Sequence, residues 1–104
     1  MLLDTDNPIT PVPIDFAQGT LTNLTTITAR WTLGGSADVA SHRVDYYTDS
    51  GCSASAGAPV AKLATDTDDN FIGANGVTYY YTVTAIDNAT NETTSVCNLS
   101  LIHI

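Results

Sequence analysis

The side chains best suited to acid–base or nucleophilic chemistry are two histidines and several serines. His42 sits in an alternating apolar segment, and His103 lies near the C-terminus. Neither accompanies a Gly-x-Ser-x-Gly turn, the motif that exposes a nucleophilic serine between a strand and a helix. The sequence therefore favours a protein that is not an enzyme, with His42 as a partly buried strand residue.

Carboxylates form one dense cluster, between Asp66 and Asn70. Calcium takes roughly six to eight oxygen ligands, so Asp66, Asp68 and Asp69 are candidates for a weak calcium site. The segment lacks the central glycine and closing glutamate of the common calcium-binding loop. A solvated acidic turn is the preferred interpretation, and no other cofactor is expected.

Two cysteines, Cys52 and Cys97, could form a pair. Neither belongs to a Cys-x-x-Cys motif or accompanies a spaced histidine pair, which argues against a metal site. Joining them would close a loop of about 45 residues, worth about 4 kcal/mol in the chain-entropy model. In a chain with so few charges the pair predicts a disulfide in an extracellular or cell-surface protein. The alternative is two unrelated thiols.

Four Asn-x-Ser/Thr triplets are candidate glycan acceptors, headed by Asn23, Asn88, Asn91 and Asn98. Such triplets arise by chance in a threonine-rich chain, and a bacterial origin would leave them unmodified. The sequence therefore leaves their use open.

Composition excludes several classes of partner. The 104 residues suit one domain with a modest core. A formal charge of −8, with only three Lys and Arg residues, argues against binding to nucleic acid or to an anionic membrane surface. No segment approaches the roughly 18 apolar residues that span a bilayer, so membrane insertion is not expected. The N-terminal residues also lack the basic start and apolar centre of a secretory signal.

The elements that must position these residues are expected to be short strands. Runs of β-branched and aromatic residues are separated by Gly, Asn and Asp clusters, and no segment carries a helical apolar stripe. Seven such runs predict an all-β, seven-stranded antiparallel Greek-key sandwich. Alternation in three early runs gives these inward sets: Ile14 and Phe16; Ile27, Ala29 and Trp31; His42, Val44 and Tyr46.

Three consecutive tyrosines open the most regular run, which extends from Gly76 to Asp87. Alternation points Tyr80, Thr82 and Thr84 outward. The tyrosine run is therefore mostly core, and Tyr47 and Tyr80 remain as outward aromatic side chains for surface contact, including contact with carbohydrate. The inward residues on which the core is expected to depend are Trp31, Tyr46, Tyr79, Tyr81, Val83 and Ala85.

The chain resembles a fibronectin type III domain of the bacterial kind over roughly residues 11 to 101. Trp31 ends the second expected strand, and Tyr46 lies in the third. The chain departs from the family where Ile-Gly-Ala-Asn-Gly replaces the usual Leu-x-Pro before the sixth strand. That strand resembles the pattern Gly-Thr-x-Tyr-x-x-x-Val-x-Ala through Gly76, Tyr79, Val83 and Ala85.

This resemblance implies an immunoglobulin-like sandwich in which the sixth strand lies between the third and the seventh. It implies that Tyr79 is a corner tyrosine whose hydroxyl bonds to backbone near the turn 73–76. Most such domains have no disulfide, so a Cys52–Cys97 link would be a local addition. It would require the long loop after the third strand to wrap past the sixth.

The resemblance also implies a non-catalytic module: a spacer, adhesion or protein-interaction unit of a secreted or cell-surface protein, with neighbouring domains as partners. The expected organisation is a lead-in at 1–10, the domain at 11–101 and a tail at 102–104. The apolar C-terminal residues favour an alternative, a self-assembling subunit of an extracellular filament or virus-like particle whose terminal strands pair with another copy. The loops 34–38 and 87–93 lack Trp, Tyr and Arg anchors, so tight binding there is not expected.

Overall fold

The computed structural model describes residues 9–16, 21–22, 26–34, 39–74, 76–97 and 100–103. Over these residues the chain forms nine strands. None of the residues described belongs to a helix long and apolar enough to cross a membrane. The strands are β1 (Val12–Phe16), β2 (Leu21–Thr22), β3 (Thr26–Thr32), β4 (Val39–Tyr47), β5 (Val60–Leu63), β6 (Asp68–Ile72), β7 (Thr78–Asp87), β8 (Glu92–Thr94) and β9 (Ser100–His103).

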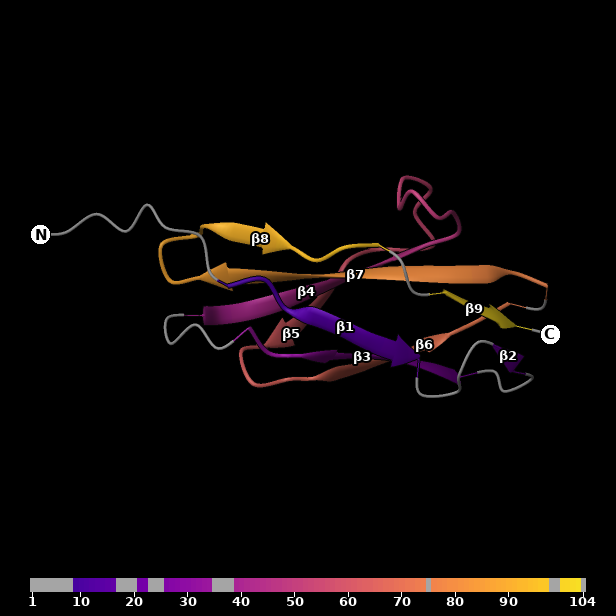
Figure 1. The fold of residues 1–104 in the computed structure, drawn as a ribbon, viewed down its shortest axis with the longest axis horizontal. Coiled ribbons are helices and arrows are strands. Elements are labelled where there is room, and N and C mark those ends of the chain that lie inside the picture. The colour runs from indigo at the N-terminus through magenta and orange to yellow at the C-terminus, as the bar shows by residue number, and fades with distance from the viewer. Residues whose placement is uncertain are drawn as a thin grey trace, which may run out of the picture.

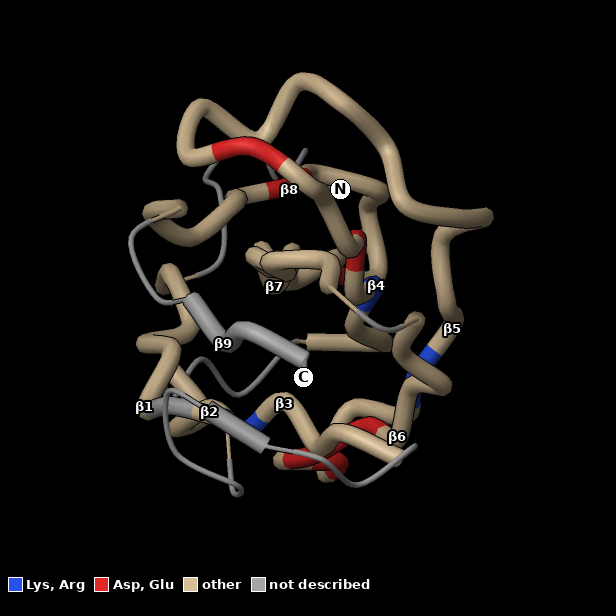
Figure 2. The backbone as a smooth tube through the Cα atoms, turned by 90° about the vertical axis from the view of Figure 1, so that its right-hand side faces the viewer, with Lys and Arg blue, Asp and Glu red and all other residues tan. Residues whose placement is uncertain are grey.

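The strands form two facing sheets, seen from the side in Figure 1 and end-on in Figure 2. One sheet has the order β1-β3-β6, and the other has the order β2-β9-β7-β4-β5, with β8 also paired to β7. The two-residue β2 runs parallel to β9, whereas the longer neighbours pair antiparallel. The predicted all-β sandwich is confirmed, and β7 lies between β4 and β9.

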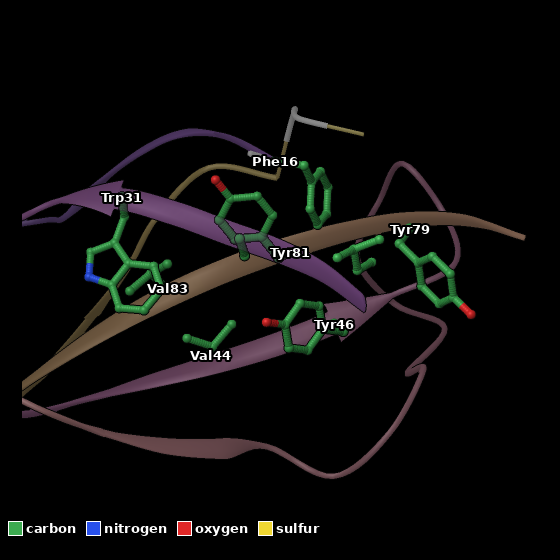
Figure 3. Packing of buried hydrophobic residues seen from close by; sticks show 9 residues of the cluster. Phe16, Trp31, Val44, Tyr46, Tyr79, Tyr81 and Val83 are labelled. Carbon is green, nitrogen blue, oxygen red and sulfur yellow. The ribbon is translucent and has the colours of Figure 1, made fainter. Parts of the chain in front are cut away.

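A largely aromatic core fills the space between the sheets (Figure 3). Phe16, from the three-stranded sheet, meets Tyr81 of the larger sheet edge to face, with ring centroids 4.9 Å apart. Phe71 stacks on Tyr46 at 4.3 Å and meets Tyr79 at 5.2 Å. These contacts tie the two layers together through rings, which gain specific contact energy beyond the area they bury. The buried cluster is Phe16, Ile27, Ala29, Trp31, Val44, Tyr46, Tyr79, Tyr81 and Val83.

The first strand differs from the expected alternation. Phe16 is buried, but Ile14 is 50% exposed, so the two do not share the inward face. The register between β1 and β3 shifts between Pro13 and Asp15, which leaves Ile14 as an extra residue. A β-bulge of this kind turns one residue out of the pleat, and simple alternation cannot anticipate it.

The expected acidic turn is partly strand. Asp68, Asp69 and Asn70 belong to β6 and pair in register with β3. The polar sequence fits a strand because β6 is an edge strand and only Asp69 of these three is buried. The last expected strand is also divided, since β8 ends at Thr94 and pairing to β7 resumes only at Ser100. Residues 102 and 103, expected as tail, lie in β9.

Candidate functional site

The aromatic residues singled out from the sequence lie in the core and not around a cleft. Trp31, Tyr46, Tyr79, Tyr81 and Val83 are each 4% exposed or less. They come from β3, β4 and β7 and point into the space between the ribbons in Figure 3. This set holds the sheets together, and its side chains are not accessible to a ligand.

Each buried tyrosine hydroxyl of this core has a hydrogen-bond partner. The backbone N–H of Ala74 donates to the Tyr79 hydroxyl at 2.7 Å, so Tyr79 anchors the turn before its own strand. This is the corner contact that the resemblance implies. The Tyr81 hydroxyl donates to the carbonyl of Arg30 in the facing sheet. Buried phenols need such partners, because an unpaired buried hydroxyl costs free energy.

The third buried hydroxyl, that of Tyr46, donates to Asp69 Oδ2 at 2.6 Å. The other carboxylate oxygen of Asp69 accepts from Lys62 Nζ at 3.3 Å. Burial, and next the hydrogen bond to the Asp69 carboxylate, raise the pKa of Tyr46 well above its ordinary value. The three groups join β4 and β5 of the larger sheet to β6, an edge strand of the smaller sheet.

The structure shows where each of the three calcium candidates, Asp66, Asp68 and Asp69, lies. Asp68 and Asp69 are neighbours in a strand, so their side chains point to opposite faces. Asp66 accepts from the backbone N–H of Leu63 at 2.8 Å. Over the described part of the chain no three His, Cys, Asp or Glu side chains gather as a metal site. Asp66 and Asp69 instead both lie beside Lys62 Nζ, at 4.0 and 3.3 Å, while Asp68 is exposed.

His42 is buried beside Trp31, with ring centroids 6.4 Å apart. Its Nδ1 lies 3.1 Å from the carbonyl oxygen of Leu63, across the β4–β5 pair. A ring nitrogen bonded to backbone in this way helps to hold β4 and β5 together. His42 is thus more fully buried than the sequence indicated.

The outer face of β7 differs from expectation. Thr82 and Thr84 point away from the core, yet they are 4% and 0% exposed. Thr84 Oγ1 bonds to Thr94 Oγ1 at 2.9 Å, and Arg43 lies beside it, paired with Glu92 at 3.1 Å. The outward residues of β7 are buried because other segments cover them.

One covering segment is the β4–β5 connection, which arches over β7 in Figure 2. Cys52 in this connection is disulfide-bonded to Cys97, with Cα atoms 6.1 Å apart. We call the two joined segments, 48–56 and 95–97, the strap. The predicted disulfide is confirmed, and disulfides of this kind are typical of proteins from oxidising compartments.

Hydrogen bonds within and beside the strap also hold its two segments. Asp49 Oδ1 accepts from the backbone N–H groups of Ser53 and Ala54 at 2.9 Å, and Oδ2 accepts from the Ser53 hydroxyl at 2.6 Å. The Ser53 hydroxyl bond, with the backbone bond from Ala54, lowers the pKa of Asp49. On the other segment, Ser95 N–H donates to the carbonyl of Val83, and Val83 N–H donates to Ser95 Oγ. Each half of the strap therefore has hydrogen bonds of its own in addition to the disulfide.

The strap lies beside Tyr47, one of the two outward aromatic residues. Tyr47 and Tyr80 are register partners on β4 and β7, and Tyr47 also bridges to Ser55 in the strap. Both rings are half-buried. They are adjacent, as a carbohydrate platform requires, but neither is freely exposed.

The loop 87–93 is held by a buried carboxylate. Asp87 Oδ1 accepts from the backbone N–H groups of Ala89 and Asn91, and Oδ2 accepts from Asn91 Nδ2 at 3.0 Å. Thr90 has φ 68°, a left-handed conformation that a β-branched residue rarely adopts. Of the Asn-x-Ser/Thr triplets, Asn88 is exposed and Asn91 is engaged by Asp87, while Asn23 and Asn98 lie outside the described residues. Most of the loop 34–38 also lies outside them.

The fold and its surface define a class: an all-β sandwich domain with an aromatic core and one disulfide strap. A scan of the chain against models of known protein families finds no match, and a search of curated proteins finds none either. The function must therefore be argued from the geometry.

Proposed function

We propose that this domain is a non-catalytic, fibronectin type III-like module that serves as a spacer or adhesion unit of a secreted or cell-surface protein. The order of β4, β7 and β9 and the Tyr79–Ala74 corner bond support the family part of the proposal. The disulfide supports the extracellular part.

The observation that carries the spacer role is where the chain enters and leaves the sandwich. Thr10 Oγ1 bonds to Thr93 Oγ1 at 2.9 Å, beside the end of β7 at which Ile86 pairs with Glu92. At the other end of β7, Thr78 pairs with Ile102 of β9. The ten residues of β7 separate these points by roughly 30 Å at about 3.4 Å per residue. A chain that enters at one end and leaves at the other adds length to whatever it joins.

Two of the edge strands, β1 and β5, carry features that hinder pairing with another chain, which suits a module that stays monomeric. β1 carries Pro13 and a bulge, and on β5 the N–H of Leu63 is already bonded to Asp66. Prolines, bulges and occupied N–H groups are the usual means by which edge strands avoid pairing with other chains. The C-terminal strand β9, expected to bridge copies in the alternative self-assembling subunit, pairs within the chain with β7 and β2. We therefore favour the spacer over the filament subunit.

Solution dimensions test this proposal. The isolated domain is expected to elute as a monomer at micromolar concentration, and two copies fused in series are expected to lengthen the particle by roughly 30 to 40 Å in small-angle scattering. Polymers that disappear when residues 99–104 are removed would support the subunit instead. Two fused copies that pack side by side, with little gain in length, would refute the spacer role. Binding of Tyr47 and Tyr80 to a glycan array, lost in their alanine variants, would support the carbohydrate alternative.

A further inference from the structure

Tension along a spacer would reach this domain through its first and last strands. β1 runs from Val12 toward Phe16, away from the end at which the chain enters. β9 runs toward the opposite end, so that Ile102 lies beside the first residue of β7, Thr78. Pulling the two ends apart therefore slides each terminal strand along its neighbour, a geometry in which several hydrogen bonds are stretched together.

The C-terminal strand is the less firmly held part of the larger sheet. β9 has three register pairs with β7, from Thr78–Ile102 to Tyr80–Ser100, and two with the short β2. The next paired segment back along the chain, β8, also has only three register pairs with β7. Without a further link, tension that detached β9 would pass to β8 and then directly to β7, which carries much of the core.

The disulfide supplies a different path. Cys97 lies between β8 and β9, and its partner Cys52 lies in the connection that follows β4. β4 has eight register pairs with β7 and four with β5, more than either C-terminal strand. Its side chains also reach the core and the facing sheet, through Val44 and through the Tyr46–Asp69 bond. Tension that arrives at Cys97 can thus bypass β8 and reach β4, which is paired along both of its edges.

We propose that the Cys52–Cys97 disulfide relays tension from the C-terminal segment to β4, so that β9 can detach while the rest of the sandwich stays folded. The 45 residues enclosed by the bridge, which include β5 to β8, are then shielded from extension. Oxidation state sets how far the domain can lengthen. The proposal rests on the spacer function for its purpose, but not for its mechanics.

Single-molecule force spectroscopy on the full chain, pulled from its two ends, tests the relay. The oxidised domain is expected to show two events: release of β9, with little gain in length because this strand already runs along the pulling direction, and then a separate unfolding event. Its final extended length is expected to be about 160 Å shorter than that of the same chain under reductant, at about 3.5 Å for each of 45 shielded residues. The reduced chain is expected to unfold in one step. Because the same polypeptide is compared, no substitution confounds the result.

A truncation gives an independent measurement. Removing residues 99–104 deletes β9, and the oxidised product is expected to keep a cooperative thermal transition and the buried environment of Trp31. The same truncation in the Cys52→Ser, Cys97→Ser double variant is expected to abolish that transition. Full-length double variant is the matched control for the substitutions themselves.

Two results would overturn the relay: a single unfolding step at the same force in oxidised and reduced chains, or a truncated oxidised chain as unfolded as its serine counterpart. Neither result touches the spacer proposal, which depends on the length of fused copies. Conversely, fused copies that pack side by side would remove the spacer role and leave the two-step extension of the isolated domain as it stands.

Discussion

Replacing Tyr46 by phenylalanine tests whether the hydrogen-bonded side chains of Tyr46, Asp69 and Lys62 stabilise the contact between the two sheets. The substitution keeps the ring that stacks on Phe71 and removes only the hydroxyl that donates to Asp69 at 2.6 Å. Asp69 is 8% exposed, so no solvent readily takes the place of the lost donor. Hydrogen bonds to charged groups contribute about 1.5 to 3 kcal/mol. We therefore expect the free energy of unfolding to fall by about 2 kcal/mol.

The pH dependence of that loss is a sharper test than its size. In the folded state the pKa of Tyr46 is raised above its ordinary value of 10.0, so the folded domain keeps a proton that the unfolded chain releases near pH 10. The stabilisation is therefore fully present below pH 10 and is lost as the pH rises beyond it, by up to about 1.4 kcal/mol per pH unit for one proton. The stability difference between the wild type and Tyr46→Phe should be constant from pH 7 to 9 and should shrink toward pH 11.

Urea unfolding followed by the fluorescence of Trp31, the single tryptophan, measures these differences. Tyr47→Phe is the matched control, because it removes an outward hydroxyl from the same strand and should change stability by less than about 0.5 kcal/mol. Equal stability of the two variants would refute the role assigned to the buried chain. A difference that persists unchanged at pH 11 would refute the proton argument while leaving the hydrogen bond intact.

Three further substitutions test the strap, the N-terminal segment and the loop 87–93. Replacing Cys52 and Cys97 by serine should lower the free energy of unfolding by about 4 kcal/mol for a loop of 45 residues, measured by urea unfolding against the oxidised wild type. Gly34→Ala should lower the free energy of unfolding by about 1 to 3 kcal/mol, because a Cβ there would lie 2.3 Å from the backbone oxygen of Ile9. Gly57→Ala is the control and should lower it much less, because the nearest atom to its Cβ would be 3.9 Å away. Thr90→Gly should raise the melting temperature slightly, by relieving about 0.5 to 1 kcal/mol of left-handed strain at φ 68°; an unchanged or lower melting temperature would contradict that explanation.

Alternation predicted the interior of the sandwich well because the central strands are regular. In β3, in β7 and in β4 from His42 onward every second residue faces the core; the start of β4 departs from this pattern, because Ala40 is exposed and the register with β7 shifts between Val39 and Ser41. Alternation did not predict the burial of the outer face of β7. Thr82 and Thr84 are polar, and polarity alone predicts side chains exposed to solvent. Thr84, for example, is in contact with Arg43 of β4 and Thr94 of β8, and the alternation within β7 carries no information on these neighbours.

The acidic residues are a second place where the structure differs from what the local sequence pattern predicts. Asp66, Asp68 and Asp69 lie close in sequence, a pattern interpreted as a solvated acidic turn with a weak calcium site as the alternative. The structure separates them by strand geometry: Asp69 turns inward to Tyr46 and Lys62, and Asp66 turns back to the N–H of Leu63. The sequence does contain a signal for this outcome, because Lys62 is the single lysine of the chain and lies seven residues before Asp69. A lone cation near a carboxylate cluster favours an ion pair over a metal site.

The position of Lys62 explains how a strongly acidic chain can join the edge strands β5 and β6 of its two sheets. Lys62 is held between two carboxylates, at 3.3 Å from Asp69 and 4.0 Å from Asp66, and it bridges the strands that flank the gap between the sheets. If Lys62 stabilises the domain mainly by its charge, Lys62→Met, which keeps a side chain of similar length, should destabilise the domain by leaving Asp69 buried without its cation. Acid should then reduce this loss of stability as carboxylates become protonated. If it matters mainly by covering apolar surface, Lys62→Met should be neutral and Lys62→Ala should be costly. Urea unfolding of the two variants at pH 7 and pH 4 distinguishes these outcomes, and equal loss in both variants at both pH values would refute the charge argument.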